Sequence, residues 1–300
     1  MKQHWNQENI PDQSGRVAIV TGSSSGIGYA AALALAAKNA QVIMAVRNPD
    51  KGNVAINKIK ALYPHANIQQ RPLDLADLAS VRAFADTFKS DYRQLDLLIN
   101  NAGVMIPPYS KTKDGFELQF GTNHLGHFAL TAQLLDLVLN TPQSRIVNVS
   151  SSAHRAGNID FDDLTWEKRK YVPWSAYGDS KIANLYFTFE LAKKLREQGK
   201  DTITAACHPG WTATDLQRYS GVFNSLNHLF AQHPDMGCLP TLYAAIAPDV
   251  NSGDFIGPGG FMEMRGYPQK VKAKDLAYDK DIAAKLWTVS EALTEVKYEL

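Results

Sequence analysis

Cysteine is scarce in this sequence, with only Cys207 and Cys238 among 300 residues. Two cysteines cannot build a disulfide framework or, on their own, a metal cluster, so we read them as ordinary thiols of a reducing compartment. An excess of one charge is also missing, because 31 Lys and Arg face 30 Asp and Glu. A chain without a basic excess is not expected to bind nucleic acid through its phosphates.

Long apolar runs are absent too. The longest, residues 29–37, is alanine-rich and far shorter than the roughly 20 residues that cross a bilayer. The first fifteen residues are polar and lack the apolar core of a signal peptide. We therefore expect a cytoplasmic protein without a membrane anchor, whose 45% hydrophobic content supports a sizeable core.

Short apolar runs alternate with helical patterns along most of the chain. We predict strands over 17–20, 41–46, 68–73, 95–99, 145–149 and 202–207, with a short seventh near 254–256. Helices are expected up to about residue 38, over 50–62, from Asp77, over 121–139 and over 176–196. This order predicts a Rossmann-type, doubly wound α/β fold with a mainly parallel seven-stranded sheet and helices on both faces.

No shift of composition divides the chain, so residues 1–300 are expected to form a single domain. Its cofactor-binding core would span about 15–209, and a C-terminal strand and tail would span 250–300. Residues 210–240 lack strong periodicity but hold several aromatic side chains. They form either a lid on the substrate side of the sheet or a surface excursion with its own small core.

A glycine-rich turn, TGSSSGIG, follows the first predicted strand and opens the first helix. Gly22 allows a tight turn, Gly26 lets backbone approach a pyrophosphate, and Gly28 lets the helix pack closely on the sheet. The N–H groups at the helix N-terminus would bind the phosphates. This predicts a dinucleotide site whose loop residues are Gly22, Ser23, Ser24, Gly26, Ile27 and Gly28, with a serine hydroxyl as an added donor.

The cofactor preference is predicted from Arg47, nineteen residues after Gly28 at the end of the second strand. Sites that prefer NAD usually carry an acidic residue there, which accepts from the ribose 2′-hydroxyl. An arginine cannot accept, but it can pair with a 2′-phosphate and stack on adenine. We therefore expect NADP(H) to be preferred over NAD(H), unless Arg47 is merely a solvated side chain.

Tyr177 and Lys181 stand four residues apart, on one face of a predicted helix. An ammonium about 5 Å from a phenolate, at an effective dielectric of about 20, supplies roughly 3 kcal/mol, or about two pK units. That shift predicts a tyrosine able to act as an acid or base near neutrality during hydride transfer. The YxxxK pattern alone is weak, because it recurs by chance on many helices.

Further motifs follow the predicted strands in order: NNAG at 100–103, Asn123 in a long helix, a triple serine at 150–152 and HPGWTAT at 208–214. With the glycine loop and YxxxK, they resemble the short-chain dehydrogenase/reductase family over nearly the whole chain. The RIVNVSSxAH and HPGxxxT(D/E)L patterns resemble its branch of retinol dehydrogenases, WW-domain oxidoreductases and protochlorophyllide reductases.

The resemblance implies a role for each matching residue. Tyr177 would be the acid/base, Lys181 would bind the nicotinamide ribose, Asn123 would hold a water of the proton relay, and Ser151 would orient substrate. The triple serine leaves Ser150 and Ser152 open as alternatives. The remaining cofactor contacts would come from Asp74, Leu75, Asn101, Ala102, Gly103, Pro209, Gly210, Trp211, Thr212 and Thr214.

Several polar residues close to these motifs are expected to have no part in the chemistry. Asp179 is expected to face solvent, and His124 and His127 to be surface or packing histidines, with no metal site. His154 is left open as a substrate-facing side chain.

The predicted activity is reversible hydride transfer between nicotinamide and a carbonyl or alcohol. The aromatic content of the substrate-side segments favours a bulky, apolar substrate, and the long stretch before Tyr177 favours a monomer over a homodimer. The alternative is a catalytically silent NADP(H)-binding sensor or interaction protein on the same fold.

Overall fold

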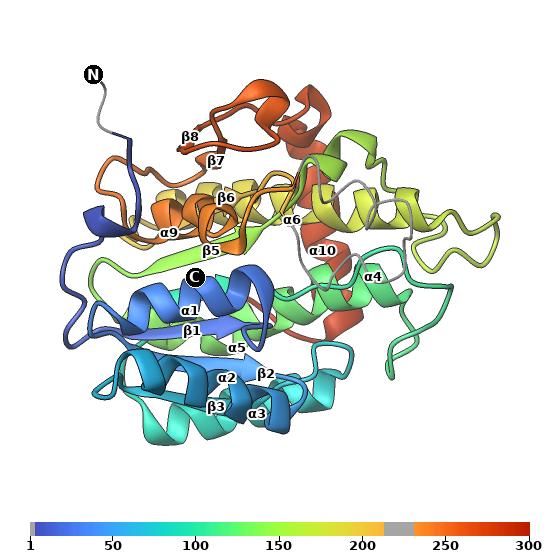
Figure 1. Cartoon of the computed structure of the whole chain (residues 1–300). Helices are drawn as coiled ribbons and strands as arrows, with labels where there is room; N and C mark the ends of the chain where they lie inside the picture. The colour runs from blue at the N-terminus through green and yellow to red at the C-terminus, as the bar shows by residue number, and fades with distance from the viewer. Residues whose placement is uncertain (1–3, 213–230) are drawn as a thin grey trace.

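The computed structural model describes residues 4–212 and 231–300, and within these ranges one eight-stranded sheet forms the centre of the molecule (Figure 1). Its order is β3-β2-β1-β4-β5-β6-β7-β8. The strands are β1 (Val17–Thr21), β2 (Gln41–Val46), β3 (Ile68–Pro72), β4 (Leu97–Asn100), β5 (Arg145–Val149), β6 (Ile203–Cys207), β7 (Phe255–Pro258) and β8 (Pro268–Lys270). The strand order reverses at β1, so the crevice between the ends of β1 and β4 is where such sheets bind ligands.

The sheet differs from the predicted seven strands by the addition of β8. The first seven strands pair in parallel, whereas β8 runs antiparallel to β7 with Gly257 opposite Gln269. This strand is three residues long, and two of its residues are exposed, so it lacks the apolar run that marked the others. Its pairing depends on the hairpin that joins it to β7.

Helices cover both faces of the sheet, as predicted. One face packs against α1 (Gly26–Ala36), α2 (Pro49–Leu62) and α9 (Leu239–Ile246). The other packs against α3 (Leu78–Asp91), α5 (Gly126–Leu139) and α6 (Pro173–Glu197). Figure 1 shows α10 (Lys280–Thr294) lying outside this second layer, where Trp287 contacts Phe128 and Phe187. Two short helices, α4 (Leu118–Phe120) and α8 (Pro234–Gly237), complete the α-helices of the described residues.

Local signals explain where the main helices begin. Asn48 caps α2 and Asp77 caps α3, each through a side-chain oxygen that accepts backbone N–H groups. The helix α6 begins at Pro173, three residues before the predicted Ala176, because proline suits the first helical turn. Among the strands, β2 and β5 match the predicted ranges, β1, β3 and β6 differ by one residue at one end, β4 begins two residues later than predicted, and β7 extends two residues further.

The predicted lid at 210–240 lies largely outside the described residues, so its role stays a prediction. Within residues 4–212 and 231–300, no helix has both the length and the apolar character needed to cross a membrane.

Candidate active site

A cleft of about 1120 Å³ opens along the carboxyl ends of the central strands. It brings together residues that lie far apart in the sequence, from the glycine loop to the Pro-Gly turn after β6. Most of the predicted site residues line it: Gly22, Ser24, Gly26, Ile27, Gly28, Arg47, Asp74, Leu75, Asn101, Ala102, Gly103, Ser151, Tyr177, Lys181, Pro209, Gly210, Trp211 and Thr212. Thr214 lies outside the described residues.

The glycine loop forms the floor of the cleft and leaves no room for a side chain at Gly22 or Gly28. Gly22 has φ +65°, and a Cβ there would lie 2.8 Å from the Cα of Ala102. A Cβ on Gly28 would lie 2.4 Å from Asn101 Nδ2. The loop leads directly into the N-terminus of α1, whose free N–H groups favour anions. These features fit the pyrophosphate of a dinucleotide.

The serines of this loop do not share one role. Ser23 is fully buried and its Oγ donates to the Val20 carbonyl at 2.8 Å, so the expectation of a cofactor-facing hydroxyl at Ser23 is corrected. The reason is local, since the hydroxyl satisfies a carbonyl at the end of β1. Ser24 and Ser25 line the cleft, and Ser25, the residue before α1, was missed because it carries no distinguishing pattern.

The NNAG motif is held against the end of β1 by Thr21. The Thr21 Oγ1 accepts the N–H groups of Asn101 and Ala102, each at 2.9 Å, and Asn101 Nδ2 donates to the Thr21 carbonyl at 2.8 Å. The first asparagine, Asn100, instead points into the core and donates to Asn148 and Thr131. The motif thus combines one structural amide with a cleft wall of small residues.

Asn123 lies behind this wall, in a π-helical turn at Gly121–Leu125 that precedes α5. Its side chain accepts from Val104 N at 2.8 Å and donates to Val104 O at 3.0 Å and Ser180 Oγ at 2.9 Å. The amide therefore bonds the loop after β4 to α6, the helix that carries Tyr177 and Lys181. The relay water expected at Asn123 stays a prediction.

Tyr177 and Lys181 lie buried on α6, with 4% and 3% of their surfaces exposed. The Lys181 Nζ is 5.7 Å from the centre of the Tyr177 ring and donates to the Val149 carbonyl at 3.1 Å. Burial raises the pKa of Tyr177 to about 12, although a hydrogen bond with Ser151 lowers it. Burial also lowers the pKa of Lys181 to about 8. The near-neutral tyrosine pKa expected from the sequence is therefore wrong for the protein chain alone.

The three serines after β5 point in different directions. Ser150 is buried and donates to the Lys181 carbonyl at 2.8 Å, which fixes α6 to the end of β5. Ser151 bonds to Tyr177 and also accepts from Ala153 N at 3.2 Å. Ser152 is exposed and begins a 3-10 helix. Of the three predicted candidates, the structure places Ser151 beside the tyrosine.

The Pro-Gly turn after β6 packs on the hairpin between β7 and β8. Gly210 has φ +66°, and Trp211 N donates to the Met264 carbonyl at 2.7 Å. Met262, Glu263 and Met264 of this hairpin line the cleft, as do Arg155 and Trp174. Sequence reasoning missed the hairpin residues, because nothing local signals that a segment more than fifty residues after the Pro-Gly turn returns to it.

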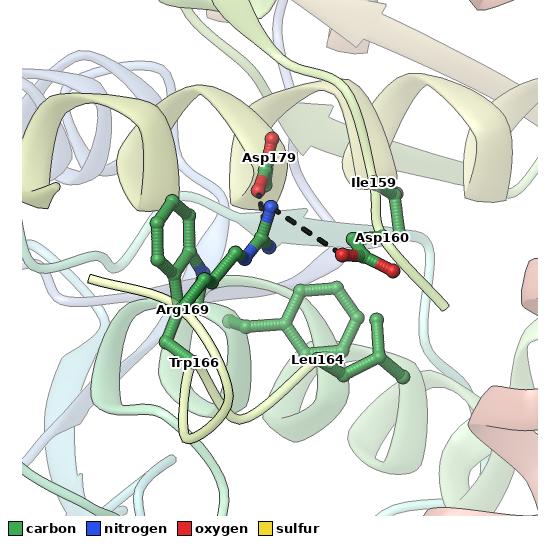
Figure 2. A pocket seen from close by; sticks show the side chains of 7 residues that line it. Ile159, Asp160, Leu164, Trp166, Arg169 and Asp179 are labelled. Carbon is green, nitrogen blue, oxygen red and sulfur yellow. Dashed lines mark ion pairs between the residues drawn. The ribbon is translucent and has the colours of Figure 1, made fainter. Parts of the chain in front are cut away.

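The segment before Tyr177 is fastened to α6 by Arg169. Its guanidinium is 3.7 Å from the centre of the Trp166 ring and forms ion pairs with Asp160, Asp163 and Asp179. Figure 2 shows the pairs with Asp160 and Asp179. Asp179 also accepts from Asn158 N at 2.7 Å. The solvent-facing position expected for Asp179 is therefore wrong, because this segment covers that face of the helix. Burial raises the pKa of Asp179 to about 6.

His154 is also buried and does not face the cleft. Its Nδ1 donates to the Ser151 carbonyl at 2.7 Å and its Nε2 accepts from Lys274 N at 3.1 Å. The open possibility of a substrate contact at His154 is thus corrected, since both ring nitrogens bind main chain. His124 and His127 are buried packing histidines, as one of the two expected roles allowed.

The fold and this cleft indicate a class of protein, and comparison with known proteins identifies that class. A family model for short chain dehydrogenases matches residues 16–222. The chain therefore belongs to the short-chain dehydrogenase family of oxidoreductases, whose members transfer hydride with a nicotinamide cofactor.

The relatives place it more narrowly. Retinol dehydrogenase 13 of Homo sapiens is 40% identical over 290 residues, covering 93% of this chain and 84% of that protein. Retinol dehydrogenase 11 of Mus musculus is 46% identical over 241 residues, covering 79% and 75%. A solved structure of an uncharacterized protein from Mycobacterium paratuberculosis is 41% identical, with a TM-score of 0.85 over 99% of this chain and 100% of that one. The chain is a member of the retinol dehydrogenase branch.

Proposed function

We propose that this protein is an NADP(H)-dependent oxidoreductase that interconverts a carbonyl and an alcohol on a bulky, apolar substrate, with Tyr177 as the acid/base. The observation that carries the proposal is the buried Tyr177, hydrogen-bonded to Ser151 and one turn from Lys181, at the wall of the cleft. The glycine floor beside it fits a dinucleotide. All three side chains therefore serve one reaction centre.

The cofactor, when bound, supplies or accepts the hydride. The chain's own residues handle the proton. Because the pKa of Tyr177 is about 12, its phenol is protonated at neutral pH and suited to donate a proton to a carbonyl oxygen as that oxygen becomes an alcohol. Ser151 supports the same oxygen, and the Lys181 ammonium stabilises the phenolate that remains.

The preference for NADP(H) is supported by Arg47. This residue follows β2 directly, is exposed at the cleft, and forms no ion pair or hydrogen bond within residues 4–212 and 231–300. Asp50 and Lys51, at the start of α2, line the cleft beside it. An unengaged guanidinium at this position suits a 2′-phosphate.

The substrate class is supported by the other end of the cleft. Met105, Trp174, Met262 and Met264 line it and provide apolar, adaptable surface. The names of the relatives add retinoid alcohols and aldehydes to the substrates worth testing. The monomeric state and the cytoplasmic location stay predictions, which gel filtration and cell fractionation would check.

The experiment follows NADPH absorbance over a panel of aldehydes, ketones and alcohols that includes retinaldehyde. We expect Tyr177→Phe to reduce kcat by about a thousandfold or more while NADPH affinity changes less than about threefold, because only the transferable proton is removed. Tyr186→Phe is the matched control, since this α6 tyrosine donates to the Leu276 carbonyl away from the cleft. An active Tyr177→Phe protein contradicts the acid/base assignment. Tight NADPH binding without turnover on any substrate would favour the sensor.

A further inference from the structure

A buried histidine joins the cofactor side of the site to the catalytic side. His127 is 1% exposed and lies on α5, immediately after the π-helical turn that carries Asn123. Its Nε2 is 2.9 Å from Thr21 Oγ1, and its Nδ1 is 3.0 Å from the main-chain carbonyl of Asn123. His127 does not line the cleft, and the sequence predicts only a surface or packing role for it.

The hydrogen bonds leave one arrangement of protons. A carbonyl only accepts, so the Nδ1 of His127 must carry the hydrogen toward Asn123. Thr21 Oγ1 already accepts two N–H groups from the NNAG motif, so its own proton must be donated. The His127 Nε2 lies at 2.9 Å, closer than the Ile99 carbonyl at 3.4 Å. The imidazole is therefore neutral, with hydrogen on Nδ1, and burial lowers its pKa to about 4.

His127 thus forms a hydrogen-bonded bridge between Thr21 and Asn123, and these two residues contact different parts of the site. Thr21 holds Asn101 and Ala102 in the cofactor wall. Asn123 binds Ser180, which lies between Tyr177 and Lys181 on α6. A Cβ built on Gly103 would lie 3.1 Å from Asn123 Oδ1 and 3.6 Å from Lys181 Nζ, so the amide and the ammonium flank the same glycine. A π-helical turn is wider than an α-helical one and often occurs at functional sites.

We propose that His127 is a positioning residue for the reaction: its ring holds the carbonyl of Asn123 and the hydroxyl of Thr21 at a set separation, and so keeps the π-helical turn aligned with Lys181. The inference rests on the proposed function. The two hydrogen bonds of His127 differ in whether another group can replace the ring. Thr21 keeps two N–H partners and can redirect its proton to Ile99, whereas the Asn123 carbonyl loses its side-chain partner.

The test compares His127→Leu and His127→Asn with His124→Leu. His124 is equally buried, lies three residues earlier and bonds to Ser290 on α10, away from the cleft. We expect His127→Leu to lower kcat about tenfold while the KM for NADPH changes less than about twofold, since the loss falls on Asn123. The asparagine amide can replace Nδ1–H, so His127→Asn should recover kcat to within about threefold of the parent protein. His124→Leu should lose stability but keep kcat.

Two kinetic results would overturn the proposal. One is a kcat for His127→Leu that matches that of His124→Leu. The other is an asparagine variant as slow as the leucine variant. Nitrogen-15 NMR of the histidine-labelled parent protein tests the tautomer without any substitution, and an Nε2–H or charged ring at pH 7 would refute the bridge. An active Tyr177→Phe protein would instead refute the proposed function, so the two failures are distinguishable.

Discussion

Single side chains carry the chemistry that distinguishes this protein within its fold. Arg47 offers a charge at the end of β2 where the backbone alone would accept either dinucleotide. The neighbouring side chains of Ser150 and Ser151 point in different directions. Ser151 bonds the Tyr177 phenol, whereas Ser150 donates to the Lys181 main-chain carbonyl. At this scale, function depends on where a donor points.

Replacing Arg47 by aspartate tests the cofactor preference. We expect Arg47→Asp to reduce the ratio of kcat/KM for NADPH to that for NADH by about a hundredfold, because a carboxylate repels a 2′-phosphate and accepts from a 2′-hydroxyl. Steady-state kinetics with both cofactors measures the ratio. Arg82→Asp makes the same charge change at an exposed position of α3 outside the cleft and should leave the ratio unchanged. An unchanged ratio in Arg47→Asp would sink the 2′-phosphate interpretation.

At the scale of elements, the segment before α6 acts as a cover for the catalytic helix. Arg169 joins three carboxylates, two on the segment and Asp179 on the helix, and its guanidinium lies over the Trp166 ring. Asp179 stands two residues after Tyr177, so this contact fixes the first turns of the helix. The burial that raises the pKa of Asp179 to about 6 makes the paired cation necessary at neutral pH.

Removing that cation should loosen the cover. We expect Arg169→Met to lower the free energy of unfolding by about 2 kcal/mol at pH 7.5, a value reduced for the partial exposure of the guanidinium. The loss should shrink near pH 5, because Asp179 then takes up a proton and no longer needs a partner. Urea denaturation at both pH values measures this, with exposed Lys170→Met as the control. Equal losses at the two pH values would contradict the account.

At the scale of the whole molecule, buried histidines tie stability to pH. Burial lowers the pKa of His124 to about 3 and those of His127 and His154 to about 4. The unfolded chain therefore binds more protons than the folded one between about pH 6.5 and 4, and stability falls as pH falls through that window. Asp179 acts in the opposite direction below about pH 6, but as one group against three.

We expect the free energy of unfolding to fall by about 1 kcal/mol per buried histidine for each pH unit below about 6.5. Urea denaturation at pH 7.5, 6.5 and 5.5 measures the slope. His154→Gln should flatten it, because one of the three groups no longer titrates. His233→Gln, at an exposed residue, should not. A stability that is constant over this range would show that the buried histidines are not neutral in the folded protein.

The order of strands and helices followed from the sequence because its signals are local. Apolar runs such as 41–46 and 145–149 are buried on both faces, and the glycine turn between β1 and α1 needs φ values that glycine adopts freely. The same holds for the spacing of Tyr177 and Lys181, which depends only on helical geometry. Motif order along the chain was enough to predict the position of the cleft and about half of the residues that line it.

Contacts between distant segments were decided only by the tertiary structure. Asp179 is covered because of a neighbouring segment that no local pattern encodes. The β7–β8 hairpin reaches the Pro-Gly turn through a main-chain bond, and His127 acquires its two partners from β1 and the π-helical turn. The sequence by itself thus determined the fold class and the candidate reacting groups, since these depend on residue type and short spacing. The direction, burial and pKa of each side chain were decided only by the tertiary structure, because they depend on which groups pack against that side chain.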